Sequence, residues 1–124
     1  MTLNKNQLAR CLKMELEGDA LFDKFSRGLY STDASHYQIN PIGVVIPKSA
    51  DNISQIITIA AQFKAPILPR GSGTSQCGQT VGKAIVIDTS KHLNKILEFN
   101  AAERTIWVEP GLVLDKLKHP TKDY

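Results

Sequence analysis

Apolar residues change their spacing along the chain, and each spacing predicts a different kind of element. Between Asn4 and about Leu16 they recur at helical spacing, which predicts a first helix. A polar break follows, and Asp19 is expected to cap a second, short helix that runs through Phe25. We therefore expect residues 1–29 to form a helical N-terminal segment.

The middle of the chain alternates between strand patterns and a helix pattern. Two continuous β-branched runs, residues 42–46 and 84–88, predict strands that are buried on both faces. Between them, Ser49 is expected to cap a helix. The predicted buried face of this helix consists of Ile53, Ile56, Ile57, Ala60 and Phe63. Residues 65–69 are short and apolar and predict a further strand, which leads into a glycine-rich loop.

The last third of the chain predicts an antiparallel hairpin. Residues 96–100 and 105–109 alternate, or nearly alternate, around a polar turn, and Pro110-Gly111 closes the pair. Trp107 stands at an alternating position of the second strand, so it is expected to belong to the core. Residues beyond the hairpin resemble the first turns of a helix up to Leu117, and residues 118–124 are expected to be a tail without apolar pattern.

Composition excludes several classes of protein. The 124 residues, 42% of them hydrophobic, suffice for one domain that needs neither disulfides nor a metal to fold. The net charge of +3 comes from interspersed charges, and only 6% of residues are aromatic, so the basic stripe and stacking platforms of a nucleic-acid binder are missing. The sequence has no run of 18 apolar residues, and its N-terminus mixes charges into the apolar pattern, so we expect neither a membrane span nor a signal peptide. We therefore expect a cytoplasmic protein. Two cysteines and three scattered histidines show no disulfide framework and no metal-ligand spacing.

The glycine-rich loop carries the chemistry that the sequence offers. It interleaves Gly71, Gly73, Gly78 and Gly82 with Ser72, Thr74, Ser75 and Thr80. Backbone amides without bulky side chains over them can converge on phosphate oxygens, which predicts a cradle for an anion or a pyrophosphate. Arg70 is the local cation, and the sequence leaves open whether it contacts phosphate, orders the loop or is a solvated charge.

Two common nucleotide motifs do not fit this loop. The dinucleotide fingerprint needs a third glycine and a following helix, but Gln76 stands at the glycine position and a strand follows. The phosphate-loop motif of nucleotide triphosphatases is nearly met by residues 73–80, but Gln79 replaces its lysine. A glycine-rich surface turn without function is the remaining simple interpretation.

The other polar residues near the loop favour structural roles. Cys77 is expected to be a small side chain packed under the loop rather than a reactive thiol, because the loop offers it no basic neighbour except the distant Arg70. Asp33, His36 and Tyr37 precede a strand and are expected to be solvated or capping residues rather than a catalytic set.

Several ordered motifs resemble a known family. They are Pro69-Arg70-Gly71-Ser72-Gly73-Thr74-Ser75 followed by Gly78, the strand Ile85-Val86-Ile87-Asp88, and Val108-Glu109-Pro110-Gly111. Together they resemble the FAD-binding domain of the vanillyl-alcohol oxidase and p-cresol methylhydroxylase superfamily, and most of all its FAD-linked oxidases of the D-lactate dehydrogenase and glycolate oxidase type. The resemblance implies an α+β fold, a small mixed sheet with flanking helices, in which residues 30–117 form the first part of the FAD-binding domain.

The resemblance also implies roles for these motifs. Gly71, Ser72, Gly73, Thr74 and Ser75 would bind the FAD pyrophosphate through backbone amides, with Pro69 and Arg70 at the edge. Gly78 would let the chain approach the flavin, and Pro110-Gly111 would form the turn after the strand that lines the cofactor. Some relatives attach FAD through a histidine where this chain has Thr74, so noncovalent binding is expected.

The function that the resemblance implies is oxidation of a 2-hydroxy acid such as lactate or glycolate, with hydride passing to the flavin. The family's second glycine motif and its substrate-binding domain have no counterpart in these 124 residues, so the chain is expected to be truncated and inactive alone. The alternative is a non-catalytic remnant or interaction module that binds no flavin. In both cases we expect self-association through exposed apolar surface.

Overall fold

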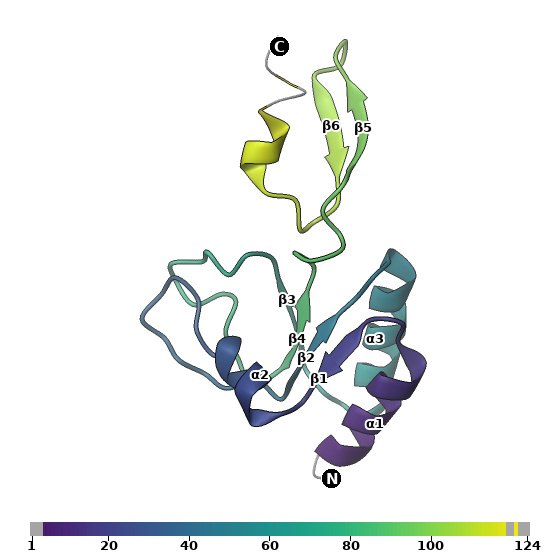
Figure 1. Cartoon of the computed structure of the whole chain (residues 1–124), viewed down its shortest axis with the longest axis vertical. Helices are drawn as coiled ribbons and strands as arrows, with labels where there is room; N and C mark the ends of the chain where they lie inside the picture. Colours follow the sequence, from purple (N-terminus) through teal and green to yellow (C-terminus); the bar gives the residue numbers. More distant parts are fainter. Residues whose placement is uncertain (1–3, 119–120, 122–124) are drawn as a thin grey trace.

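A computed structural model of the chain describes residues 4–118 and 121 (Figure 1). The elements follow in the order α1 (Lys5–Glu15), β1 (Asp19–Leu21), α2 (Lys24–Leu29), β2 (Gly43–Ile46), α3 (Ala50–Gln62), β3 (Ile67–Arg70), β4 (Ile85–Asp88), β5 (Ile96–Asn100), β6 (Thr105–Val108) and a 3₁₀ turn η1 (Leu114–Leu117). We call residues 4–93 the sheet region and residues 94–118 the hairpin region. No described helix is long and apolar enough to cross a membrane.

The sheet region is built on a mixed four-stranded sheet in the order β1-β2-β4-β3. β1 is antiparallel to β2, whereas β2 and β3 both run parallel to β4. All residues of the two central strands are buried, as their continuous apolar runs predict. The α+β fold with a small mixed sheet and flanking helices is therefore confirmed.

Two apolar layers enclose the central strands. On one face, α1 and α3 cover the sheet with Leu8, Leu12 and Ile56, which pack with Val45 and Ile85. On the other face a smaller cluster forms around Val44, Ile46 and Val86. Each fully buried side chain of this size contributes about 1.5–3 kcal/mol relative to an exposed one, so these layers hold the region together.

The predicted helix of the middle segment is confirmed, with one correction on its buried face. The hydroxyl of Ser49 accepts a hydrogen bond from the amide of Asn52 at 3.2 Å, which is the expected N-cap. Ile57, however, is 46% exposed. The helix turns Ile56, Ile59 and Ala60 to the sheet, and Ile57 lies beyond the edge of that narrower contact face.

The second N-terminal helix does not begin where the sequence predicts. Asp19 belongs to β1 and pairs with Ile46 instead of capping a helix. The cap is Asp23, whose carboxylate accepts a hydrogen bond from the amide of Ser26 at 2.8 Å. Strand pairing with a segment far along the chain prevails here over the local capping signal. Gly18 permits it, because a Cβ there would lie on the carbonyl oxygen of Ile46.

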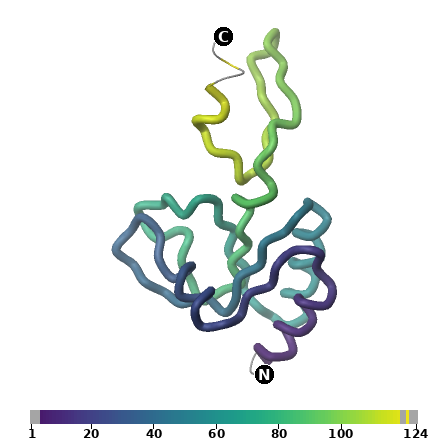
Figure 2. Tube along the Cα trace, in the orientation of Figure 1, coloured from purple at the N-terminus to yellow at the C-terminus, as the bar shows by residue number. Residues whose placement is uncertain are grey.

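The predicted hairpin is present, but its surroundings differ from the expectation. β5 and β6 pair antiparallel, with Phe99 opposite Ile106 and Asn100 opposite Thr105. The hairpin extends away from the four-stranded sheet, as the chain trace shows (Figures 1 and 2). Trp107 is 68% exposed, so its assignment to the core is wrong. A side chain that alternates on a strand is buried only where a second layer covers that face.

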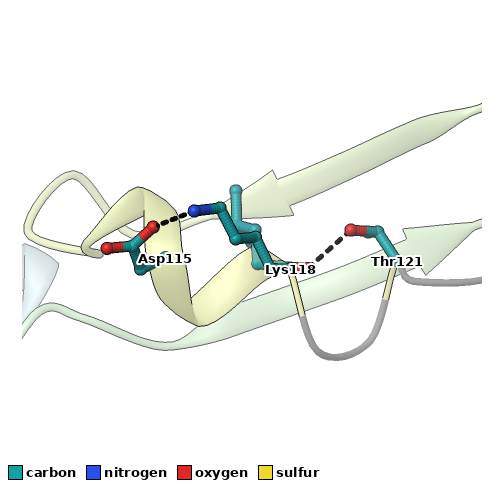
Figure 3. Close-up of polar contacts among 4 residues, drawn as sticks. Asp115, Lys118 and Thr121 are labelled. Atoms are coloured by element: carbon teal, nitrogen blue, oxygen red, sulfur yellow. Dashed lines mark hydrogen bonds and ion pairs between the residues drawn. The ribbon is translucent and has the colours of Figure 1, made fainter.

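The chain after the hairpin forms one 3₁₀ turn rather than the start of an α-helix. Asp115 and Lys118 form an exposed ion pair across it, and the hydroxyl of Thr121 donates to the carbonyl of Leu117 at 2.6 Å (Figure 3). Most of the expected tail, residues 118–124, lies outside the described residues.

Candidate functional site

The glycine loop leaves the sheet at the carboxyl end of β3 and lies next to the turn at Pro110-Gly111. Gly71 has the carbonyl oxygen of Pro110 as its nearest neighbour, 3.9 Å from the position of a Cβ. Gly111 donates its amide to the carbonyl of Leu93 at 2.8 Å, and a Cβ on it would collide with the carbonyl oxygen of Thr89. Two motifs that are 40 residues apart in sequence thus meet at one edge of the sheet.

A pocket opens beside the first residues of the loop. Its volume is about 400 Å³, and its lining is apolar apart from one arginine and one threonine. The lining residues are Ile53, Ile57, Ile67, Pro69, Arg70, Gly71, Ile87, Thr89 and Pro110. The exposed Ile57 therefore belongs to this pocket wall and not to the core.

The backbone amides at the start of the loop have no hydrogen-bond partner within the part of the chain that the structure describes. Among the described residues, those of Gly71, Ser72, Gly73, Thr74 and Ser75 donate no hydrogen bond. The backbone of Gly73 has a positive φ of 70°, a conformation that glycine adopts without strain. This run of free donors can bind an anion without any cationic side chain.

The loop's later residues are bonded internally. The amide of Gln79 donates to the hydroxyl of Ser75 at 3.2 Å, and that hydroxyl is also hydrogen-bonded to the Gln79 side chain. Ser75 therefore offers its amide, but not its side chain, to a ligand. Cys77 is exposed, so the expectation that it packs under the loop is wrong. The ring of Tyr37 fills the space beside Gly78 instead.

Arg70 orders the loop rather than facing outward. Its Nη1 donates to the carbonyls of Thr32 at 2.9 Å, Thr80 at 3.2 Å and Tyr30 at 3.5 Å. The guanidinium also lies over the ring of Tyr30, 5.2 Å from its centroid. It packs so closely under Gly73 that a Cβ there would lie 2.4 Å from Nη2. Of the roles left open by the sequence, the contacts favour loop ordering.

Asp33 joins the loop to the polar segment that precedes β2. One carboxylate oxygen accepts from the amide and hydroxyl of Ser35 at 2.9 and 2.5 Å. The other accepts from the hydroxyl and amide of Thr80 at 2.9 and 3.4 Å. These hydrogen bonds, those from Ser35 first, lower the pKa of Asp33 to about 2. The capping role is as expected, whereas the bond to Thr80, 47 residues away, had no signal in the sequence.

A second polar pair lies at the carboxyl end of β4. Asp88 is only 3% exposed and accepts a hydrogen bond from the hydroxyl of Tyr30 at 2.5 Å. Its other oxygen accepts from the amide and hydroxyl of Ser90 at 2.8 and 2.6 Å. Burial, together with the hydrogen bond to Asp88, raises the pKa of Tyr30. The sequence analysis gave neither residue a role, although Asp88 ends one of the strands that carry the family resemblance.

Comparison with known proteins defines the class of protein to which this site belongs. The family model of an FAD binding domain matches residues 41–124, and the chain belongs to this family. It is 37% identical over 110 residues to D-2-hydroxyglutarate dehydrogenase of Escherichia coli, covering 86% of this chain and 11% of that protein. It is 38% identical over 112 residues to the glycolate oxidase subunit GlcD of Bacillus subtilis, covering 85% of this chain and 23% of that protein.

The fold comparison agrees with the family. The structure of p-cresol methylhydroxylase with bound substrate matches with a TM-score of 0.76 at 16% identity, over 99% of this chain and 25% of that one. The chain thus has the fold of this type of FAD-binding domain and spans about a tenth to a quarter of the length of these proteins. The resemblance to FAD-linked oxidases of the D-lactate dehydrogenase and glycolate oxidase type is confirmed.

Proposed function

We propose that the glycine loop binds the pyrophosphate of FAD noncovalently through its backbone amides. The observation that carries the proposal is the run of donors from Gly71 to Ser75 that have no hydrogen bond within the described part of the chain. A pyrophosphate is held by several backbone donors, and a run of neighbouring amides that are unpaired among the described residues can supply such donors. The residues present therefore fit the cofactor that the family implies.

The surroundings of the loop assign the remaining roles. Arg70 supports the loop from beneath, since its guanidinium is engaged by backbone carbonyls and the Tyr30 ring. Pro69 and Pro110 line the adjacent pocket, and Gly111 fixes the turn beside it. Thr74 is exposed and offers no nucleophile of the kind that attaches a flavin, which supports noncovalent binding. Gly78 remains a proposed flavin contact, although the ring of Tyr37 occupies the space that a side chain at residue 78 would fill.

The proposed activity of the complete system is oxidation of a 2-hydroxy acid. The names of both relatives described above refer to the oxidation of a 2-hydroxy acid, 2-hydroxyglutarate in one and glycolate in the other. Bound FAD would supply the acceptor for a hydride. The part played by this chain is to hold the cofactor. Because it spans a small share of those relatives, we expect it to bind flavin but not to oxidise lactate or glycolate on its own.

Titration with FAD tests the proposal. We expect purified protein to quench flavin fluorescence saturably, and Gly73→Ala to weaken binding at least about tenfold. A Cβ at residue 73 meets the Arg70 guanidinium on a backbone with positive φ. The matched control is Gly82→Ala, whose Cβ would lie 3.5 Å from Leu68, an ordinary contact. Absence of any flavin response at high protein concentration would remove the binding proposal.

A second candidate function, an interaction module without flavin, rests on the hairpin region. Leu97, Trp107 and Leu114 are all largely exposed there, and exposed apolar side chains favour association. We propose that the isolated chain self-associates through this surface whether or not it binds FAD. Sedimentation should show a concentration-dependent dimer or larger species that Trp107→Lys weakens. A protein that stays monomeric and gives no flavin response would contradict both proposals, FAD binding and self-association.

A further inference from the structure

A polar segment that precedes the glycine loop by some 40 residues lies directly against it. We call residues 30–37 the clamp segment. The amide of Ala34 donates to the carbonyl of Gly73 at 3.1 Å, near the start of the loop. The ring of Tyr37 packs on Gly78, in the middle of the loop. The clamp segment therefore contacts the loop at a carbonyl within the run of free amides and again at Gly78, beyond that run.

The end of the loop is held more firmly still, at Thr80. Asp33 accepts hydrogen bonds from both its hydroxyl and its amide, whereas Arg70 donates to its carbonyl. Both donors of Thr80 and its carbonyl oxygen are thus engaged by two side chains of opposite charge. Hydrogen bonds with an ionised partner are about twice as strong as neutral ones, so Thr80 is a fixed point of the loop.

The clamp segment is itself attached to the sheet. The hydroxyl of Tyr30 donates to the buried carboxylate of Asp88 at the end of β4, and Arg70 stacks on the ring of Tyr30. The amide of Ile39 donates to the carbonyl of Ser31 at 2.8 Å, which closes the base of the segment. A rigid element therefore carries Asp33 to a set place relative to the strand from which the loop departs.

We propose that the clamp segment positions the glycine loop for its anionic ligand, with Asp33 as the positioning residue that acts through Thr80. The inference rests on the proposed function for its ligand. The loop's free amides contribute nothing to its own shape, so the loop must be held at its flanks. If the binding-competent shape is populated only in part, the apparent affinity falls by that fraction. Asp33 touches no group that would contact phosphate.

The experiment uses the full chain and FAD as the probe, with near-isosteric variants. Asp33→Asn keeps the size of the side chain but loses its charge and one acceptor, and Thr80→Val loses only the hydroxyl. We expect each to weaken FAD binding about tenfold, in line with the loss of a hydrogen bond to a charged group. Thr80→Ser keeps the hydroxyl and should bind within about twofold of the parent chain. Asp33→Asn combined with Thr80→Val should lose less than the sum of the two single losses, because both changes affect the hydrogen bond between the Thr80 hydroxyl and the Asp33 carboxylate.

Amide exchange measured by NMR separates the clamp from flavin binding. The amide of Ala34 bonds across to Gly73 and is not touched by either substitution, so it should exchange faster in Asp33→Asn and Thr80→Val. The amide of Val86 in the buried β4 should stay protected. This pattern would support the clamp even if the parent chain bound no FAD, in which case the proposed function alone would fail.

Three outcomes would overturn the positioning role. The first is unchanged exchange at Ala34 and unchanged FAD affinity in both isosteric variants. The second is an equal loss of affinity in Thr80→Ser and Thr80→Val, because packing and not the hydroxyl would then matter. The third is loss of protection at Val86 together with Ala34, which would show that Asp33 supports the whole fold rather than the loop.

Discussion

The sheet region and the hairpin region have strands of similar apolar content but opposite surroundings. Val86 of β4 is fully buried between two layers, whereas Trp107 of β6 is largely exposed. Both strands form as their sequence patterns predict. The comparison teaches that a local pattern specifies a strand, while burial depends on whether another segment covers it.

The two regions differ in their polar contacts as well. Around the glycine loop, Asp33, Arg70 and Asp88 each bond groups far away in sequence. In the hairpin region, Asp115 and Lys118 pair within one turn and are both exposed. Long-range contacts tie segments together and can shape a site, whereas an exposed local ion pair adds little to stability.

The largest expected effect comes from truncating an apolar side chain in each region. Ile56→Ala removes a fully buried side chain between α3 and the sheet and should cost about 2–5 kcal/mol of unfolding free energy. Trp107→Ala removes a larger but exposed side chain and should cost less than about 0.5 kcal/mol. Urea unfolding of the two variants checks both. Comparable losses would mean that the hairpin is packed, and the contrast between the regions would not hold.

A smaller effect is expected at the joint between the regions. Gly111→Ala places a Cβ against the backbone carbonyls of Thr89 and Leu93, so the turn must shift, at a cost of about 1–3 kcal/mol. Gly28→Ala is the control: nothing lies within 4 Å of its Cβ, and in a helix alanine should add about 0.5 kcal/mol. Equally small changes in the free energy of unfolding for Gly111→Ala and Gly28→Ala would show that the turn at Gly111 can shift to accept a Cβ at no cost.

Much of the fold could be predicted from local patterns. The helix capped by Ser49, the buried strands β2 and β4 and the hairpin all follow from spacing that each segment carries itself. The failures share one cause. Asp19 joins a strand because of a partner 27 positions away, and Trp107 is exposed because no described element covers it. Neither the pairing of Asp19 nor the exposure of Trp107 can be inferred from the neighbouring residues in the sequence.

The candidate site divides in the same way. The glycine loop was predictable, because small residues that free the backbone are visible as composition. The contacts that hold the loop were not, since Tyr30 and Asp88 lie 58 positions apart and Asp33 and Thr80 lie 47 apart. A hydrogen bond between distant segments produces no periodic pattern in the sequence. The sequence therefore predicts the glycine loop but not the hydrogen bonds that hold it in place.

The smallest change in stability is expected when one aspartate of each region, Asp33 and Asp115, is replaced by asparagine. Asp33 in the sheet region has its pKa lowered from 3.8 to about 2 by hydrogen bonds, so its contribution to stability is present above pH 3.8 and is lost as the pH falls toward about 2. Asp33→Asn should therefore be less stable than the parent chain at neutral pH, with the difference shrinking over that acid range. Asp115→Asn should change the free energy of unfolding by less than about 0.5 kcal/mol at neutral pH, because its ion pair is exposed. Urea unfolding at a series of pH values checks both, and a pH-independent loss in Asp33→Asn would mean that the charge of this carboxylate does not matter to the contact.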